Sequence, residues 1–85
     1  MTWFDLSGSD FSGADLYFAS FSGANLSGVN FSGANLKYAG FKNANLSGAN
    51  LDNVFDAQGI GEAYRSTIPN KYRYDPKKGN WVSKD

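Results

Sequence analysis

The sequence predicts an all-β protein whose backbone winds as a square solenoid of about two and a half coils, followed by a short C-terminal cap and a hairpin or extended tail. Three observations predict this architecture. A large apolar residue recurs at every fifth position, and the motif that follows it changes at two places twenty residues apart. The five-residue pattern ends after Val54. We therefore divide the chain into a repeat region, residues 1–55, and a cap with an aromatic and basic tail, residues 56–85.

The five-residue period suits neither regular element of secondary structure. On an α-helix, steps of five rotate by about 140°, which spreads the apolar residues around the cylinder. On a flat strand, an odd step sends successive residues to opposite faces. The pattern buries all these residues together only if the backbone turns a corner once per repeat around a common axis. The predicted core columns are Leu6, Phe11, Leu16, Phe21, Leu26, Phe31, Leu36, Phe41, Leu46 and Leu51.

The number of corners follows from a second regularity. Most repeats continue with Ser-Gly after the large residue, but residues 16–21 and 36–41 do not, and these two lapses lie twenty residues apart. Twenty residues make four repeats, so a coil has four sides. Residues twenty apart then stack in columns, with neighbouring backbone segments spaced by about 4.8 Å.

The residues between the large ones fit a tight turn at each corner. Glycine usually occupies the third turn position, where a type II turn needs a positive φ. Phe18 and Tyr38 occupy this position at the corner that they share, so we expect a different turn type there. Alanine precedes most large residues by two positions, with Val29 in its place before Phe31 and Ser9 before Phe11. Outward-facing Asp, Asn and Ser side chains are free to bond to water or to the turns.

The repeated run Ala-Asp/Asn-Leu/Phe-Ser-Gly resembles the pentapeptide-repeat proteins over about residues 4–55. The resemblance implies a right-handed quadrilateral β-helix. Better-known members of that family have many more coils. Some of them protect or inhibit DNA gyrase with a long acidic rod that resembles a DNA duplex, which makes a DNA-mimic modulator of gyrase one functional alternative. In this chain Asp5, Asp10 and Asp15 are replaced one coil later by asparagine, so the negative columns of such a rod are missing.

Both ends of so short a solenoid need a cover, because open ends expose apolar columns and unpaired strand edges. At the first end we expect Met1, Trp3 and Phe4 to form a plug. At the second, helix-like apolar spacing after residue 56 predicts a short helical cap that ends before Pro69.

The tail reads as a small hairpin, with aromatic and basic residues alternating at 71–74 and a turn at 75–79. Since two-stranded hairpins are seldom stable alone, this one should lie on its own β-helix or on another molecule. The obvious site on the β-helix is the corner that bears Phe18 and Tyr38. Our hypothesis for a partner-binding surface comprises Tyr17, Phe18, Lys37, Tyr38, Tyr72, Tyr74 and Trp81.

The composition argues against catalysis and against cofactors. The chain has no His and no Cys, which removes the commonest general base, the thiol nucleophile and the usual transition-metal ligands. The carboxylates of Asp5, Asp10 and Asp15 fall on three successive sides of the square and cannot converge on a metal. We therefore expect a non-enzyme without a metal site or a cofactor.

The charge and hydropathy of the chain limit the kinds of partner and the cellular location that we expect. The net charge is zero, with −2 on residues 1–55 and +2 on residues 56–85. The mildly basic tail would be attracted only weakly, and in a salt-sensitive way, to phosphate or to an acidic protein surface. Because a solvated hairpin shows the same pattern of aromatic and basic residues, we do not expect nucleic-acid binding. No apolar run suits a membrane span or a signal peptide, so we expect a soluble protein that is cytoplasmic, or virion-associated if it is phage-encoded.

The function that remains is a non-catalytic structural or protein–protein interaction module, docking as a small accessory or stabilising subunit on a larger protein assembly. A decoration protein of a phage or other particle is an alternative form of this role. Homo-oligomers through the solenoid ends or the tail are also compatible with the pattern.

Overall fold

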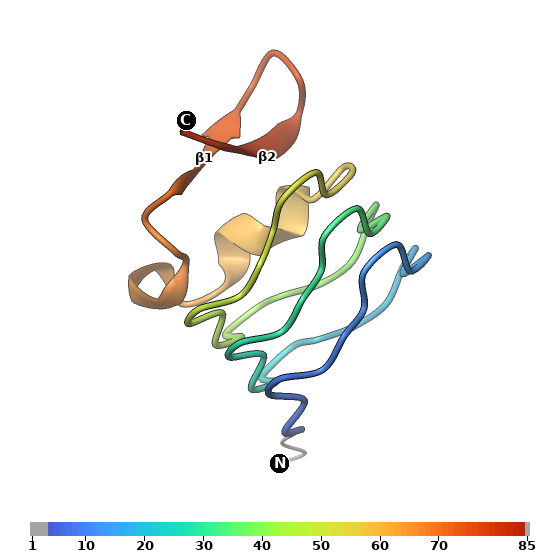
Figure 1. Cartoon of the computed structure of the whole chain (residues 1–85), viewed down its shortest axis with the longest axis vertical. Helices are drawn as coiled ribbons and strands as arrows, with labels where there is room; N and C mark the ends of the chain where they lie inside the picture. The colour runs from blue at the N-terminus through green and yellow to red at the C-terminus, as the bar shows by residue number, and fades with distance from the viewer. Residues whose placement is uncertain (1–3, 85) are drawn as a thin grey trace.

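Backbone segments twenty residues apart lie side by side in a solenoid that occupies the repeat region (Figure 1). The computed structural model describes residues 4–84, apart from the side chain of Arg65. Parallel bridges join Asp5 to Asn25 and Asn25 to Asn45 on one side, and Ser20 to Gly40 on another. Each coil therefore takes twenty residues, in the register that the sequence predicts.

The large residues of the repeats point inward and form the core. Leu26, Phe31, Leu36, Phe41, Leu46 and Leu51 are fully buried, Phe21 is nearly so, and Leu6, Phe11 and Leu16 are half-buried and pack against them. Phe11 stacks on Phe31 at 5.6 Å between ring centroids, and Phe21 stacks on Phe41 at 5.2 Å. Phe31 and Phe41 meet edge to face at 5.9 Å, a favourable geometry for aromatic pairs. The phenylalanine columns therefore meet in the centre of the solenoid.

The corner that bears Phe18 and Tyr38 has the same kind of turn as the others, so our expectation of a different turn type is wrong. The φ angles of these two residues are 63° and 60°, close to the 68° of Gly13. The reason is the hydrogen bonding between coils. The Phe18 N–H donates to the Lys37 carbonyl at 3.0 Å, as the N–H of glycine does at equivalent corners, and a backbone pairing of this kind favours the same turn.

Outward Asp and Asn side chains bond to the turn that follows them. Oδ1 of Asn25 accepts hydrogen bonds from the N–H of Ser27 at 3.1 Å and from its hydroxyl at 2.8 Å. Oδ1 of Asn30 accepts from the N–H of Ser32 at 2.9 Å. These Asx turns satisfy backbone groups that the corner leaves without an inter-coil partner.

The cap begins with two short 3₁₀-helices, η1 (Gln58–Glu62) and η2 (Arg65–Thr67). Ile60 and Ala63 are buried on the last coil, which agrees with the predicted cap, whereas Tyr64 is 55% exposed. The segment then continues into a hairpin of β1 (Tyr72–Asp75) and β2 (Asn80–Ser83), antiparallel and closed by the predicted turn.

Side chains of the cap take the place of a further coil. Within the solenoid, the N–H of a large core residue donates to a backbone carbonyl of the next coil. At the last coil, the Leu46 N–H donates instead to Oγ1 of Thr67, and the Leu51 N–H donates to the hydroxyl of Tyr72, both at 3.0 Å. Hydroxyl oxygens thus satisfy the N–H groups that would otherwise be buried without an acceptor.

Asn80 seals the point where the chain leaves the solenoid. Its Oδ1 accepts from the Ala57 N–H at 3.1 Å, and its amide nitrogen donates to the Val54 carbonyl. The hairpin therefore lies over the C-terminal end of the solenoid and not on the corner of Phe18 and Tyr38, where we expected it. The reason is that the end offers unpaired backbone groups and apolar surface together, whereas the corner offers only aromatic rings.

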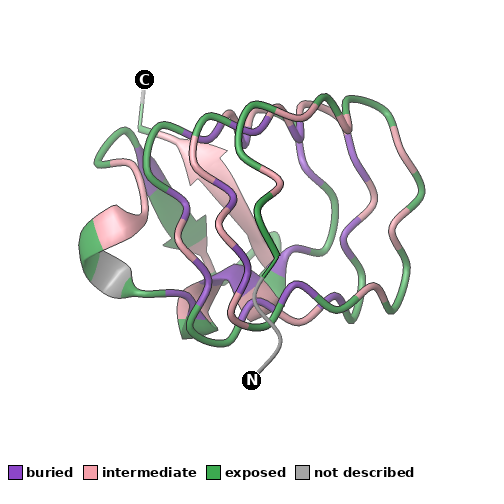
Figure 2. Ribbon diagram, turned by 90° about the horizontal axis from the view of Figure 1, so that it is seen from below, coloured by how far each residue is buried: buried purple, intermediate pink, exposed green. Residues whose placement is uncertain are grey.

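The N-terminal end of the solenoid is less well covered than the C-terminal end. Phe4 is 51% exposed, so this part of the predicted plug does not fill the end, while Met1 and Trp3 lie outside the described residues. Figure 2 shows exposed and intermediate residues dominating the coil farthest from the hairpin, and buried residues nearer the cap. Within residues 4–84, no helix has the length and apolar character needed to cross a membrane.

Candidate interaction surface

The corner shared by Tyr17, Phe18, Lys37 and Tyr38, which we call the aromatic corner, stays uncovered. Phe18 and Tyr38 are 64% and 63% exposed, and Tyr17 is 52% exposed. All three belong to the two repeats that carry an aromatic residue in place of the turn glycine, and the twenty-residue register stacks these two repeats directly. The four sequence-predicted residues of the β-helix are therefore brought together.

The three rings of the aromatic corner pack against one another. The ring centroids of Tyr17 and Phe18 are 4.7 Å apart, those of Phe18 and Tyr38 5.1 Å, and those of Tyr17 and Tyr38 5.8 Å. The Lys37 amine lies 5.5 Å from the Tyr38 centroid, within cation–π range. Mutual packing limits the freedom of the rings, so a partner would order them at a small entropic cost.

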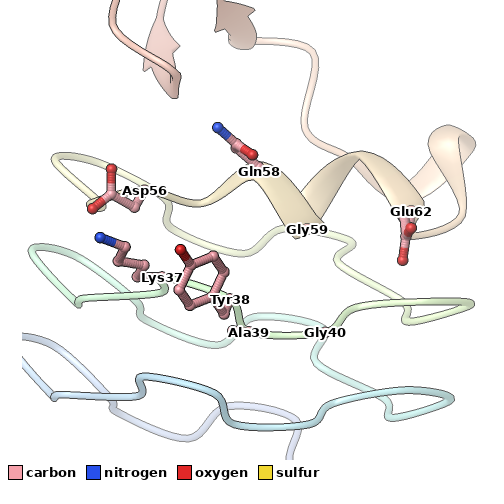
Figure 3. Close-up of a pocket in the computed structure, with 8 residues that line it drawn as sticks. All are labelled: Lys37, Tyr38, Ala39, Gly40, Asp56, Gln58, Gly59 and Glu62. Carbon is pink, nitrogen blue, oxygen red and sulfur yellow. The ribbon is translucent and has the colours of Figure 1, made fainter.

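A groove of about 620 Å³ lies beside the aromatic corner, between it and η1. Its polar lining comes from Lys37 and Tyr38 on the solenoid and from Asp56, Gln58 and Glu62 at the start of the cap. Figure 3 shows the Lys37 amine on the side of Asp56 and the Tyr38 hydroxyl turned toward Gln58. The groove therefore joins charged groups of both signs to the edge of an aromatic surface.

Sequence reasoning did not identify the cap residues of this groove. Asp56 follows the last repeat and has a φ of 51°, which turns the chain out of the solenoid toward η1. The only signal in the sequence is the break in the five-residue period at this point. Phe55, 58% exposed, was also missed, although it stands in a column where the coils below carry Asp15 and Asn35.

The tail aromatics of our hypothesis are not brought to the aromatic corner. Tyr72 is buried, and its hydroxyl donates to the Asp52 carboxylate at 2.8 Å while accepting from the solenoid. Burial, together with this bond to Asp52, raises the pKa of Tyr72 above its ordinary value. Tyr72 therefore holds the hairpin on the solenoid in this structure.

Tyr74 and Trp81 lie on a separate surface. Their rings meet edge to face at 5.9 Å, and together with Gln58 and Ile68 they line a small cleft of about 370 Å³ between the cap and the hairpin. The Trp81 Nε1 is buried and has no hydrogen-bond partner among the described residues. The two surfaces share Gln58, which lines both the groove and this cleft.

The family of the chain follows from its repeats. The family profile described as Pentapeptide repeats matches residues 2–33 and 14–53, with eight copies, and so covers more than half of the chain. This protein belongs to the pentapeptide-repeat family. Membership agrees with the β-helical solenoid.

One solved pentapeptide-repeat structure is similar to this chain. It is a pentapeptide-repeat protein from the thylakoid lumen of Arabidopsis thaliana, 34% identical, with a TM-score of 0.34. The match covers 59% of this chain and 45% of the other, so this chain spans less than half of the length of that relative. A search of curated proteins found no match.

Proposed function

We propose that this pentapeptide-repeat protein is a non-catalytic interaction module that docks onto a partner protein through its aromatic corner. The observation that carries the proposal is backbone strain at exposed residues. Phe18 and Tyr38 hold bulky side chains at φ near +60°, where L-residues cost about 1–2 kcal/mol. Their equivalents elsewhere in the solenoid are Gly or Asn, which adopt this conformation more readily.

Stability of the solenoid does not account for these aromatic residues. Both point to solvent and contact each other, so they bury little surface in return for the strain. Strained residues that the fold itself does not need are typical of functional sites. Tyr, Phe and a neighbouring cation are also residue types that protein interfaces use at their centres.

The partner that this surface suits is a larger protein or assembly, on which the solenoid acts as an accessory or stabilising subunit. The rings project from a corner, so the complementary surface is a concave apolar one. The adjacent groove supplies charged groups of both signs for a polar rim.

The test is affinity capture from the cells that produce the protein, comparing wild type with a Phe18→Gly/Tyr38→Gly variant. Glycine is the usual residue at this turn position, so the variant removes the rings without disturbing the backbone. A matched control is Tyr64→Ser, which removes an exposed ring from the cap. We expect the control to retain a stoichiometric partner that the double variant loses. Equal capture by both variants would contradict the proposal.

A further inference from the structure

The first coil differs from later coils in its charge. Its outward columns begin with Asp5, Asp10 and Asp15, where the next coil carries asparagine. Each carboxylate uses Oδ1 to accept the N–H two residues on, at 3.1, 2.9 and 3.3 Å respectively, and Oδ2 has no partner among residues 4–84. Hydrogen bonds from Ser7 and Ser12 lower the pKa of Asp5 and Asp10, so both stay ionised at neutral pH.

The same coil leaves the solenoid interior partly open. Leu6, Phe11 and Leu16 are half-buried, whereas the residues directly above them are fully buried. The N–H groups of Asp10 and Asp15 donate to no described residue, although their equivalents in the next coil bond back to the first. Within the described chain, this end therefore combines apolar surface, an unpaired backbone edge and a rim of fixed carboxylates.

The hairpin at the opposite end of the molecule carries an excess of basic side chains. The exposed side chains of Arg73, Lys77, Lys78 and Lys84 belong to the hairpin and the residue after it. Among the described residues of the hairpin, the acidic residue is Asp75, and its Oδ1 accepts a hydrogen bond from the Lys77 N–H at 2.9 Å. Figure 1 places the hairpin at one end of the long axis and the first coil toward the other, and the long axis measures 36 Å.

We propose that this protein associates head to tail, with the acidic first coil of one copy docked against the basic hairpin end of the next. The charge pattern selects this arrangement among the possible contacts between ends. Two first coils would oppose three carboxylates to three, and two hairpins would oppose cations to cations, whereas a head-to-tail contact pairs opposite charges.

This geometry has a distinctive consequence. A head-to-tail contact is heterologous, so each associated pair still presents one free acidic end and one free basic end. Association therefore continues beyond a dimer. It also weakens with salt, because the charges are exposed and are screened over about 30 Å at 0.01 M but only about 3 Å at 1 M ionic strength.

The test measures the mass of the full chain by light scattering over a concentration series at low and high salt. We expect the mean mass at low salt to rise with concentration past that of a dimer, and to return to the monomer at high salt. A monomeric mass at every concentration, or a mass that levels off at a dimer, would overturn the proposal.

Two matched variants identify the surfaces. The first, Asp5→Asn/Asp10→Asn/Asp15→Asn, keeps the turn acceptor, because asparagine makes the same bond at Asn25. The second, Arg73→Gln/Lys77→Gln/Lys78→Gln, neutralises the hairpin. We expect each variant alone to stay monomeric at low salt.

A mixture of the two variants is decisive, because each copy then retains one working end. We expect a 1:1 heterodimer that grows no further. Failure of the mixture to associate, or association of the asparagine variant alone to the wild-type mass, would show that the charged ends do not form the contact.

Discussion

Phe18 and Tyr38 place aromatic rings where the solenoid backbone favours glycine. The Phe18 N–H donates to the Lys37 carbonyl of the next coil, as glycine N–H groups do at equivalent corners, so this turn follows the pairing between coils. The side chain at this position therefore affects stability through local strain, and solvent exposure leaves little packing to oppose that effect.

This strain predicts whether replacing Phe18 by glycine raises or lowers the free energy of unfolding. Phe18→Gly should leave the free energy of unfolding unchanged or raise it by up to about 1 kcal/mol, since relief of the left-handed strain outweighs the added flexibility of glycine. Denaturant unfolding measures the change. Gly33 has a φ of +71°, and a Cβ added there would have no atom closer than 3.9 Å. Gly33→Ala should therefore lower the free energy of unfolding by about 1 kcal/mol through backbone strain alone. Equal losses in both variants would contradict the strain argument.

Gly59 is required for a different reason, the close approach of η1 to the solenoid. A Cβ at this position would lie 2.1 Å from the Ala39 carbonyl oxygen, which is backbone and cannot rotate away. Gly59→Ala should therefore displace η1 and cost about 1–3 kcal/mol in thermal or denaturant unfolding.

Gly61 provides the control for that substitution. It lies in the same short helix, but its nearest contact for a Cβ is the Trp81 ring at 3.8 Å, an ordinary van der Waals distance. Gly61→Ala should change stability by less than about 0.5 kcal/mol. A similar cost at both glycines would show that the close approach at Gly59 is not responsible, because helix propensity favours alanine over glycine at either position.

At the scale of elements, the hairpin is stable because its side chains replace a missing coil. The Tyr72 hydroxyl gives the Leu51 N–H an acceptor, and Tyr72→Phe removes that acceptor while keeping the ring. We expect the variant to lose about 1–3 kcal/mol, the usual cost of a buried donor without a partner. Amide exchange at Leu51 should also become faster, which a loss of ring packing alone would not explain.

The same hydroxyl predicts an alkaline limit to stability. The pKa of Tyr72 is raised above 10.0 by burial and by the bond to Asp52, so the folded state holds this proton more tightly than the unfolded state. The contribution is fully present below pH 10.0 and is lost as pH rises through the folded pKa. Unfolding free energies measured from pH 8 to about pH 11 should therefore fall more steeply for wild type than for Tyr72→Phe. Parallel curves would contradict the assignment, because lysines and other tyrosines titrate in both proteins.

At the scale of the whole molecule, burial increases from the first coil toward the cap (Figure 2). Phe31 is fully buried, whereas Phe11, one coil earlier in the same column, is half-buried. Phe31→Ala should cost about 3–5 kcal/mol and can unfold so small a domain. Phe11→Ala should cost clearly less, because less apolar surface is removed from a buried environment. Equal costs by denaturant unfolding would show that the first coil is as well covered as the second.

The sequence was sufficient for the solenoid itself. A five-residue period and a twenty-residue lapse predicted the columns and the four sides, since both depend on contacts that repeat at constant spacing. The hairpin turn was predicted separately, from the local turn motif at residues 75–79. The aromatic corner was predicted for the same reason, because Phe18 and Tyr38 are twenty residues apart.

Only the tertiary structure decided where the non-repeating parts lie. Single contacts between distant segments determine the turn at the aromatic corner and the position of the hairpin. They also determine the groove lined by Asp56, Gln58 and Glu62. The cap docks where Leu46 and Leu51 present N–H groups without a coil to receive them. In a repeating sequence, the spacing of the repeats determines which segments become neighbours. A segment that does not repeat packs where unsatisfied backbone groups and apolar surface lie together. That site exists only after the solenoid has folded, so the sequence pattern does not reveal it.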